Sequence, residues 1–429
     1  MNPLCRQPTL VRAIGRWALA GLIVNCVVGA GIFGLSSNVA KLVGDFSPWA
    51  YMLGAMMTAI IAAVEVELGS QFEKPGGAYL YVREAFGPLL GIQTGWFSWT
   101  ARVTTAAAIT NLLMSYLSEF WPVVATKLGT GLGSLLVVGA LAVVNVRGVK
   151  HGSSISGVFT VAKLLPLVAL IVLGFAHWGD VIEQPVSALT PDWKAWADVL
   201  VVMVFAYSGV ETAMIPGSEL KNPRRDIPIA VFAALLVVSM LYVCLHLVVM
   251  HAAPAMASSE RPLSVAASVY AGEIGGTVIS LAATLAMFGS LSAAAVTAPR
   301  LTYAMAEQGD FPAICSLVHR VYHTPWASIL LWAGVVLALA NYDSFIWIVV
   351  LSVAARLVVY STMCAAVIQL RLLHPSRDAW RAPIGIGVPL LSIGICFLLA
   401  SRLTQEHVIL MLIVSMIGLV TWAARKNPQ

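Results

Sequence analysis

Charged residues are scarce in this chain: aspartate, glutamate, lysine and arginine make up only 10% of its 429 residues. Soluble domains contain about 25% of these residue types, so the scarcity excludes an ordinary water-soluble protein. Hydrophobic residues make up 59% of the chain, and the mean hydropathy is +0.87. The sequence therefore predicts an integral membrane protein.

Signals for several other classes of protein are also missing. The six cysteines are scattered and show no metal or redox spacing, so no metal site is expected. No nucleophile–base constellation and no nucleotide-binding loop is recognisable, which argues against an enzyme and leaves no cofactor to expect. The first apolar segment lacks a small-residue cleavage site and is longer than a signal peptide, so we expect it to be retained.

Long apolar runs define the expected architecture. Runs of about 17 residues or more predict helices that cross a ~30 Å hydrocarbon core, and about twelve are present. They lie near residues 15–43, 48–70, 86–118, 132–147, 153–176, 195–219, 227–251, 272–306, 326–341, 344–371, 385–401 and 406–424. The expected fold class is thus all-α, with a single membrane domain over residues 1–429.

The lysines and arginines between these runs are unevenly distributed. If the N-terminus is inside, the cytoplasmic side carries Arg6, Arg12, Arg16, Lys74, Arg83, Arg147, Lys150, Lys221, Arg224, Arg225, Arg300, Arg320, Arg371, Arg377, Arg381, Arg425 and Lys426. The opposite side carries Lys41, Lys127, Lys194, Arg261 and Arg402. The positive-inside rule then predicts that both termini are cytoplasmic. The net charge of +5 reflects this topology, and no nucleic-acid partner is expected.

Glycines interrupt the first apolar run at residues 29–34, GAGIFG. Each glycine costs about 1 kcal/mol relative to alanine in a helix interior. In lipid, any backbone group that leaves the helix must also find another partner. The glycines either let another helix pack closely, as small residues do in membranes, or mark a broken helix whose free backbone ends form a binding site.

A second interruption occurs in the sixth run. Residues 205–212, FAYSGVET, place small, polar and acidic residues inside an apolar helix, and a charged turn follows at 219–228. Breaks at matching places in two halves predict an inverted repeat with a site at the interface. The repeats would cover about residues 15–176 and 195–371, leaving two extra C-terminal helices at about 385–424.

Three further motifs accompany the two breaks. Residues 75–79, PGGAY, form a turn between the second and third runs, and residues 79–86 predict a short amphipathic helix on the membrane surface. Residues 299–306, PRLTYAMA, lie in the eighth run, and residues 360–366, YSTMCAA, lie in the tenth.

In this order, the motifs resemble those of the amino acid–polyamine–organocation superfamily of transporters, and they cover spans one to ten. The resemblance implies a LeuT-like, five-plus-five inverted-repeat fold in which helices 1 and 6 are broken. It also implies secondary transport of amino acids or related amines, and not an enzyme.

The two breaks offer backbone atoms to a zwitterion. Unpaired amides at Gly31, Ile32 and Phe33 would form a positive helix end suited to a carboxylate. Carbonyl groups at the ends of the preceding half-helices would accept hydrogen bonds from an α-ammonium group. Gly31→Val should then abolish transport and leave membrane expression nearly intact. The predicted substrate-binding set is Val27, Val28, Gly29, Ala30, Gly31, Ile32, Phe33, Ser98, Arg102, Phe205, Ala206, Ser208, Gly209 and Glu211.

The resemblance implies roles for several side chains. Cys26, Ser98 and Arg102 would face the cavity, and Phe205 would be an aromatic gate, although an ordinary packing role for Phe205 stays open.

Lys163 lies where sodium-using relatives bind a cation between the first and eighth spans. Its ammonium group would replace sodium, with carbonyls near Val28 and Gly29 and the hydroxyl of Ser290 as partners. A proton-coupling role for Lys163 is one hypothesis, and a lysine that snorkels to the cytoplasmic interface is the other.

Charges inside the membrane are functional candidates because each is costly unless it is paired or solvated. They are Glu65, Glu67, Arg102, Lys163, Glu211 and Arg356. We predict an Arg102–Glu211 pair that leaves a neutral site. In the alternative, Arg102 pairs with Glu65 or Glu67, of which at least one is structural. Arg356 is either a cavity charge or part of an internal ion pair.

The sequence thus predicts a sodium-independent transporter of neutral amino acids in the cell (inner) membrane, working by alternating access as an exchanger or proton symporter. Its expected partners are the amino acid, a proton as candidate co-substrate, and membrane lipid, and the oligomeric state stays open. A polyamine or cationic amino acid antiporter is the alternative within transport. A non-transporting amino acid sensor or a partner-dependent subunit is the alternative from another class. A water-filled channel is disfavoured because no ring of polar residues lines any span.

Overall fold

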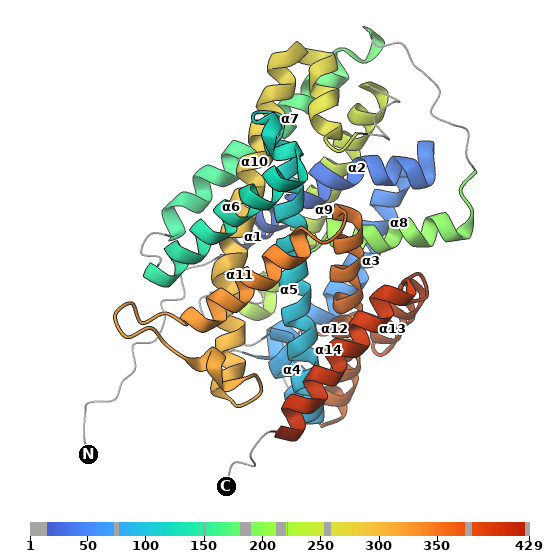
Figure 1. Cartoon of the computed structure of the whole chain (residues 1–429). Coiled ribbons are helices and arrows are strands. Elements are labelled where there is room, and N and C mark those ends of the chain that lie inside the picture. The colour runs from blue at the N-terminus through green and yellow to red at the C-terminus, as the bar shows by residue number, and fades with distance from the viewer. Residues whose placement is uncertain are drawn as a thin grey trace.

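The computed structural model describes residues 15–72, 77–148, 152–180, 190–211, 220, 222–252, 259–373 and 380–424. Within these ranges the regular elements are α-helices and short 3-10 helices, as the composition predicts. The α-helices are α1 (Arg16–Val27), α2 (Ala30–Val43), α3 (Ser47–Gln71), α4 (Gly77–Phe86), α5 (Pro88–Leu117), α6 (Lys127–Arg147), α7 (Gly152–Ala176), α8 (Trp193–Ala206), α9 (Pro223–Ala252), α10 (Pro262–Glu307), α11 (Trp326–Ala340), α12 (Phe345–Leu373), α13 (Gly387–Ala400) and α14 (Gln405–Ala424) (Figure 1).

Six helical stretches in the described ranges are long and apolar enough to cross a membrane. They are Ala30–Gln71, Lys127–Arg147, Arg224–Ala252, Pro262–Glu307, Phe345–Leu373 and Gln405–Ala424. Four shorter apolar helices accompany them. Large apolar side chains on α14, among them Leu412, Met416 and Val420, are exposed on the protein, as expected for a surface that faces lipid.

Three of the expected spans are irregular. The first is divided into α1 and α2, and α8 ends at Ala206, within the sixth. Residues 212–219, in which the sixth span was predicted to continue, lie outside the described residues. α10 is interrupted at Ala271 and Gly272, and Gly272 has φ +63°, which only glycine adopts readily. The eighth span predicted from residue 272 thus follows a separate short helical segment.

The helix α5 runs through the middle of the bundle and packs against α12, α10 and α4 (Figure 1). Ala106, Ala107 and Ala108 are fully buried on it, because small side chains let neighbouring helices approach closely in a membrane protein. The last two helices lie on one side of the bundle, α13 against α12 and α3, and α14 against α5 (Figure 1).

The short helix α4 is present where the sequence predicts one, but its apolar face does not lie on lipid. Tyr81 and Val82 are buried, and the helix packs against α5 and α12. Arg83 and Tyr79 hydrogen-bond and Arg83 pairs with Asp310, while Gln308 Oε1 accepts hydrogen bonds from Arg83 (2.8 Å) and Tyr79 (2.7 Å). Burial and the Asp310 carboxylate raise the pKa of the Tyr79 hydroxyl, so it remains a donor near neutral pH. These hydrogen bonds and the ion pair hold α4 against the C-terminal end of α10.

Candidate functional site

The first break separates α1 from α2 at Val28 and Gly29. Both residues are extended, with φ −71° and ψ 98° at Val28 and φ −161° and ψ −139° at Gly29. No side chain caps the start of α2. The first amides of a helix have no intrahelical acceptor, so α2 presents a positive helix end at the predicted site.

The second break follows Ala206 and lies directly against the first. A side-chain carbon placed on Gly31 would lie 2.7 Å from Ala206 Cα. Gly209 has φ +111°, and a carbon placed there would lie 3.0 Å from the carbonyl oxygen of Cys26. Both glycines therefore allow backbone-to-backbone contact, and Gly209 also supplies a conformation that other residues rarely adopt. The two breaks therefore lie directly against each other, backbone to backbone.

This contact corrects the expectation for Gly31→Val. The space beside Gly31 is filled by the backbone of Ala206, which cannot rotate away as a side chain can. A valine there would force the two broken helices apart, so we now expect loss of stability as well as loss of transport.

A tyrosine that the sequence analysis missed joins the two breaks. Tyr242 of α9 lies with its hydroxyl 2.9 Å from the Val27 carbonyl oxygen and 3.2 Å from that of Ala206. Tyr207 donates to the Tyr51 carbonyl oxygen at 2.9 Å, and the rings of Tyr51, Tyr207 and Tyr242 pack together. A tyrosine in an apolar span carries no sequence signal of which backbone it will reach.

Four of the carbonyl groups predicted to bind the α-ammonium, those of Val27, Val28, Phe205 and Ala206, already accept hydrogen bonds. Val27 and Ala206 face Tyr242, Val28 accepts from Lys163, and Phe205 accepts from the Ser208 amide at 3.0 Å. Because a carbonyl oxygen has two lone pairs, an ammonium group would be its second donor.

Lys163 reaches the first break from α7. It is 3% exposed, and its Nζ donates to the Val28 carbonyl oxygen at 2.7 Å and to that of Asn25. Ser290 Oγ would lie 3.4 Å from a carbon placed on Gly29. The structure thus brings Lys163 to the end of α1 and Ser290 to Gly29, whereas a part in coupling stays a prediction.

The predicted Arg102–Glu211 pair is wrong. Glu211 pairs with Arg356 of α12 and accepts a hydrogen bond from the Gly209 amide at 2.8 Å. Arg356 also donates to Thr105 at 3.0 Å. Arg102 lies near both partners and interacts with their charges, but no Arg102–Glu211 ion pair is found in the described ranges. The sequence left Arg356 either as a cavity charge or as part of an internal ion pair, and the structure shows the ion pair with Glu211.

The sequence analysis expected at least one of Glu65 and Glu67 to be structural, and Glu67 is such a residue. It accepts two hydrogen bonds from Arg371, at 2.7 and 2.5 Å, and one from the Ala382 amide at 2.8 Å. Glu67 is therefore a structural residue that joins α3, α12 and the segment before α13. Glu65, two residues earlier, instead lines a small cavity together with Glu211.

The remaining side chains predicted to face the cavity are Ser98, Phe205 and Cys26. The Ser98 hydroxyl is buried and has no hydrogen-bond partner in the described part of the chain. Phe205 is buried, and its ring meets that of Phe345 edge to face at 6.2 Å between centroids. Phe345 also lies beside Gly34, so Phe205 and Phe345 form an aromatic pair next to α2. Cys26 is exposed on α1.

The described residues include no group of three or more histidine, cysteine, aspartate or glutamate side chains placed to hold a metal ion. The five cysteines in the described residues, Cys26, Cys244, Cys315, Cys364 and Cys396, form no disulfide bonds.

Comparison with known proteins identifies the family. A family model described as amino acid permease matches residues 14–425. The chain belongs to the amino acid permease family. This membership agrees with the resemblance to the amino acid–polyamine–organocation superfamily and with an integral membrane transport protein that is not an enzyme.

Curated relatives of the permease have several substrates. It is 29% identical over 414 residues to a serine/threonine exchanger of Bacillus subtilis, with 92% of each chain covered. It is 25% identical to a methylthioribose transporter of Bacillus subtilis, over 91% of this chain and 88% of the relative. It is 26% identical over 308 residues to a cadaverine/lysine antiporter of Escherichia coli K12, which covers 71% of this chain and 69% of that protein.

Proposed function

We propose that the permease is a secondary transporter of neutral amino acids that works by alternating access without sodium. The observation that carries the proposal is the contact between the two breaks, at Gly31 and Ala206. It places a positive helix end beside the carbonyl ends of two other half-helices. The α-carboxylate would bind the first amides of α2, and the α-ammonium would bind the carbonyls at the ends of α1 and α8.

A five-plus-five inverted repeat accounts for this arrangement. Span one, which is interrupted at Val28 and Gly29, and span six, whose helix α8 ends at Ala206, would be the first helices of the two repeats, and α13 and α14 would lie outside them. The inside charge bias supports a cytoplasmic location for both termini.

Charge balance supports a neutral side chain on the substrate. The Glu211 carboxylate is already paired with Arg356, and Arg102 adds a positive charge nearby. A second ammonium group would therefore meet no uncompensated negative charge at Glu211. The relative that exchanges serine and threonine fits this account more closely than the cadaverine/lysine antiporter.

The proposed absence of sodium coupling depends on Lys163. Its ammonium group donates to the Val28 carbonyl oxygen at the end of α1, which is the kind of oxygen that would coordinate a sodium ion. A buried cation already at this place would repel a second one.

Counterflow with purified protein in liposomes tests the function. Vesicles loaded with one unlabelled amino acid should take up a labelled one, and small neutral amino acids should compete best, in sodium or in potassium buffer. Best competition by lysine, arginine or diamines would support the polyamine alternative. Failure of every amino acid to produce counterflow would favour a sensor or a partner-dependent subunit.

A further inference from the structure

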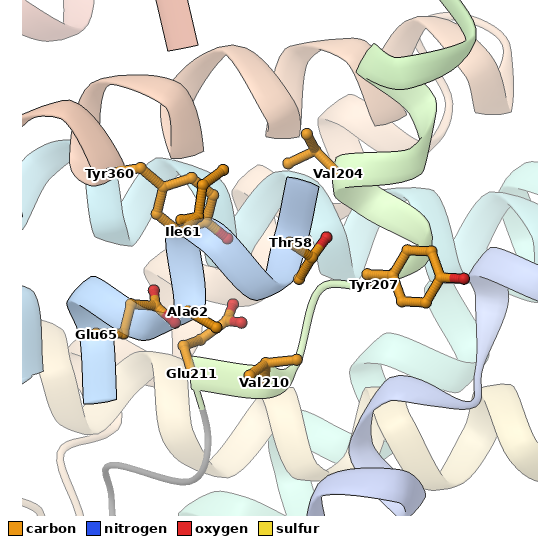
Figure 2. Close-up of a pocket in the computed structure, with 9 residues that line it drawn as sticks. All are labelled: Thr58, Ile61, Ala62, Glu65, Val204, Tyr207, Val210, Glu211 and Tyr360. Carbon is orange, nitrogen blue, oxygen red and sulfur yellow. The ribbon is translucent and has the colours of Figure 1, made fainter. Parts of the chain in front are cut away.

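A small cavity lies between α3, α12 and the segment that follows α8. Its polar lining comes from Thr58, Glu65, Tyr207, Glu211 and Tyr360, and the rest of its wall is apolar. Figure 2 shows the carboxyl groups of the two glutamates entering the same space. The cavity has room for about one water molecule, so an amino acid does not fit there in this conformation.

The two carboxyl groups are held very differently. Glu211 is paired with Arg356 and accepts the Gly209 amide. Glu65 is 5% exposed and accepts no hydrogen bond from the residues that the structure describes. A buried carboxylate without a donor or a counterion is unfavourable. Glu65 therefore lacks the partners that an ionised side chain requires.

Among the described groups that interact with Glu65, the positively charged one, Arg356, is already paired with Glu211. The titratable groups that interact with it or share its cavity are Tyr81, Tyr207, Glu211, Arg356, Tyr360 and Cys364. Arg356 is bonded to Glu211, and Arg102 of α5 lies near that pair.

Titratable groups on other elements around α3 have different neighbours. Asp198 of α8 pairs with Arg402, and Glu67 pairs with Arg371. His246 of α9 packs on Tyr51, and Tyr242 faces the breaks. Cys396 of α13 lies near Cys364.

We propose that Glu65 is a proton-binding site through which the permease couples transport to protons. When the cavity is open to one side of the membrane, an oxygen of the Glu65 carboxylate forms an O–H bond with a proton delivered by hydronium, which becomes neutral water. The resulting carboxylic acid is uncharged and donates a hydrogen bond to the cavity water or to Glu211. When the cavity opens to the other side, the same O–H bond breaks and water accepts the proton.

Other buried charges near the breaks are less suited to this role. Lys163 donates to two carbonyl oxygens, and Glu211 has both a counterion and an amide donor. Removal or addition of a proton at either residue would break existing hydrogen bonds. At Glu65, protonation creates a donor beside an acceptor and breaks none. The inference rests on the proposed transport function.

Proteoliposomes containing the parent protein or Glu65→Gln test the proposal. Glutamine keeps the size of the side chain and its ability to donate, but it cannot exchange a proton. A pH difference of about one unit corresponds to about tenfold accumulation when one proton accompanies each substrate molecule. The parent protein should accumulate its best neutral substrate when the outside is acidic. Glu65→Gln should lose this accumulation and retain counterflow.

Two further variants separate the charge from the fold. Glu65→Asp keeps a carboxyl group and should keep accumulation, and Glu273→Gln, at an exposed position of α10, is the control and should behave as the parent. A pH-sensitive dye inside the vesicles should report acidification when substrate is added to the parent and to Glu65→Asp; if Glu65→Gln does not fold, the absence of acidification in the parent would still overturn the proposal.

The outcomes distinguish the two proposals. Counterflow without acidification or gradient-driven accumulation in the parent would overturn the proton site and leave the transport function intact. Accumulation that persists in Glu65→Gln would also overturn it. No counterflow with any amino acid would overturn both.

Discussion

Alanine substitutions at three glycines should separate close helix contact from simple helix flexibility. A side-chain carbon added at Gly31 would lie 2.7 Å from Ala206 Cα, and one added at Gly29 would lie 3.4 Å from Ser290 Oγ. A carbon added at Gly21 would meet no other atom within 4 Å. A carbon–carbon contact prefers about 3.5–4.0 Å. The 2.7 Å separation at Gly31 therefore requires the two half-helices to move apart, whereas the other two sites tolerate a methyl group.

The expected magnitudes follow from two opposing effects. Replacing glycine by alanine in a helix gains about 1 kcal/mol in stability, and overpacking costs about 1–3 kcal/mol. Gly21→Ala should thus resist heat at least as well as the parent, and Gly31→Ala should be less stable. Moving the α2 amides would also weaken a charged hydrogen bond worth about 1.5–3 kcal/mol, which is about tenfold or more in substrate affinity.

Heating of detergent-purified protein followed by size-exclusion chromatography measures stability, and concentration-dependent counterflow measures affinity. We expect Gly31→Ala to have lower heat stability and lower substrate affinity than the parent. Gly29→Ala should stay near the parent in stability, and Gly21→Ala should match the parent in transport. If Gly31→Ala equals Gly21→Ala in heat resistance and in affinity, the contact between the breaks does not position the substrate.

The other predictions concern side chains around the same site. Lys163→Ala should abolish counterflow because its carbonyl partners lose their donor, and parent uptake should be equal in sodium and potassium buffer; stimulation by sodium would contradict this. Tyr242→Phe should lower thermal stability by about 1–3 kcal/mol, since buried carbonyls lose their donor; unchanged unfolding on heating would contradict it. Arg356→Ala should leave Glu211 uncompensated and admit lysine as a competitor of neutral substrate, whereas Arg102→Ala should change competition less; the reverse order would restore the Arg102–Glu211 account.

Much of the backbone could be predicted because membrane helices carry strong local signals. Apolar runs located the helices to within several residues, and glycine and polar residues located both interruptions. The amino acid permease family match supports the class that these motifs indicated. The contact of Lys163 with the Val28 carbonyl was anticipated from the family resemblance, whereas its second acceptor in the described residues is Asn25 and not the predicted Ser290 hydroxyl.

Side-chain partners between distant helices were harder to predict. Helical periodicity puts Ser98 and Arg102 on one face of α5, but it does not fix how α5 is rotated against α12. Glu211 consequently found Arg356, 145 positions further along the chain, and not Arg102. Tyr242 was missed for the same reason: its partners are carbonyl oxygens, and every residue carries one.

The hydroxyl of Tyr242 lies within hydrogen-bond distance of two carbonyl oxygens, one on the last turn of α1 and one on the last turn of α8. A hydroxyl has one hydrogen and can donate to only one of these carbonyls at a time. If the two half-helices slide past each other, the bond transfers from one oxygen to the other and need not be lost. The Tyr242 hydroxyl can therefore keep a hydrogen bond to one of the two helix ends when α1 and α8 shift relative to each other.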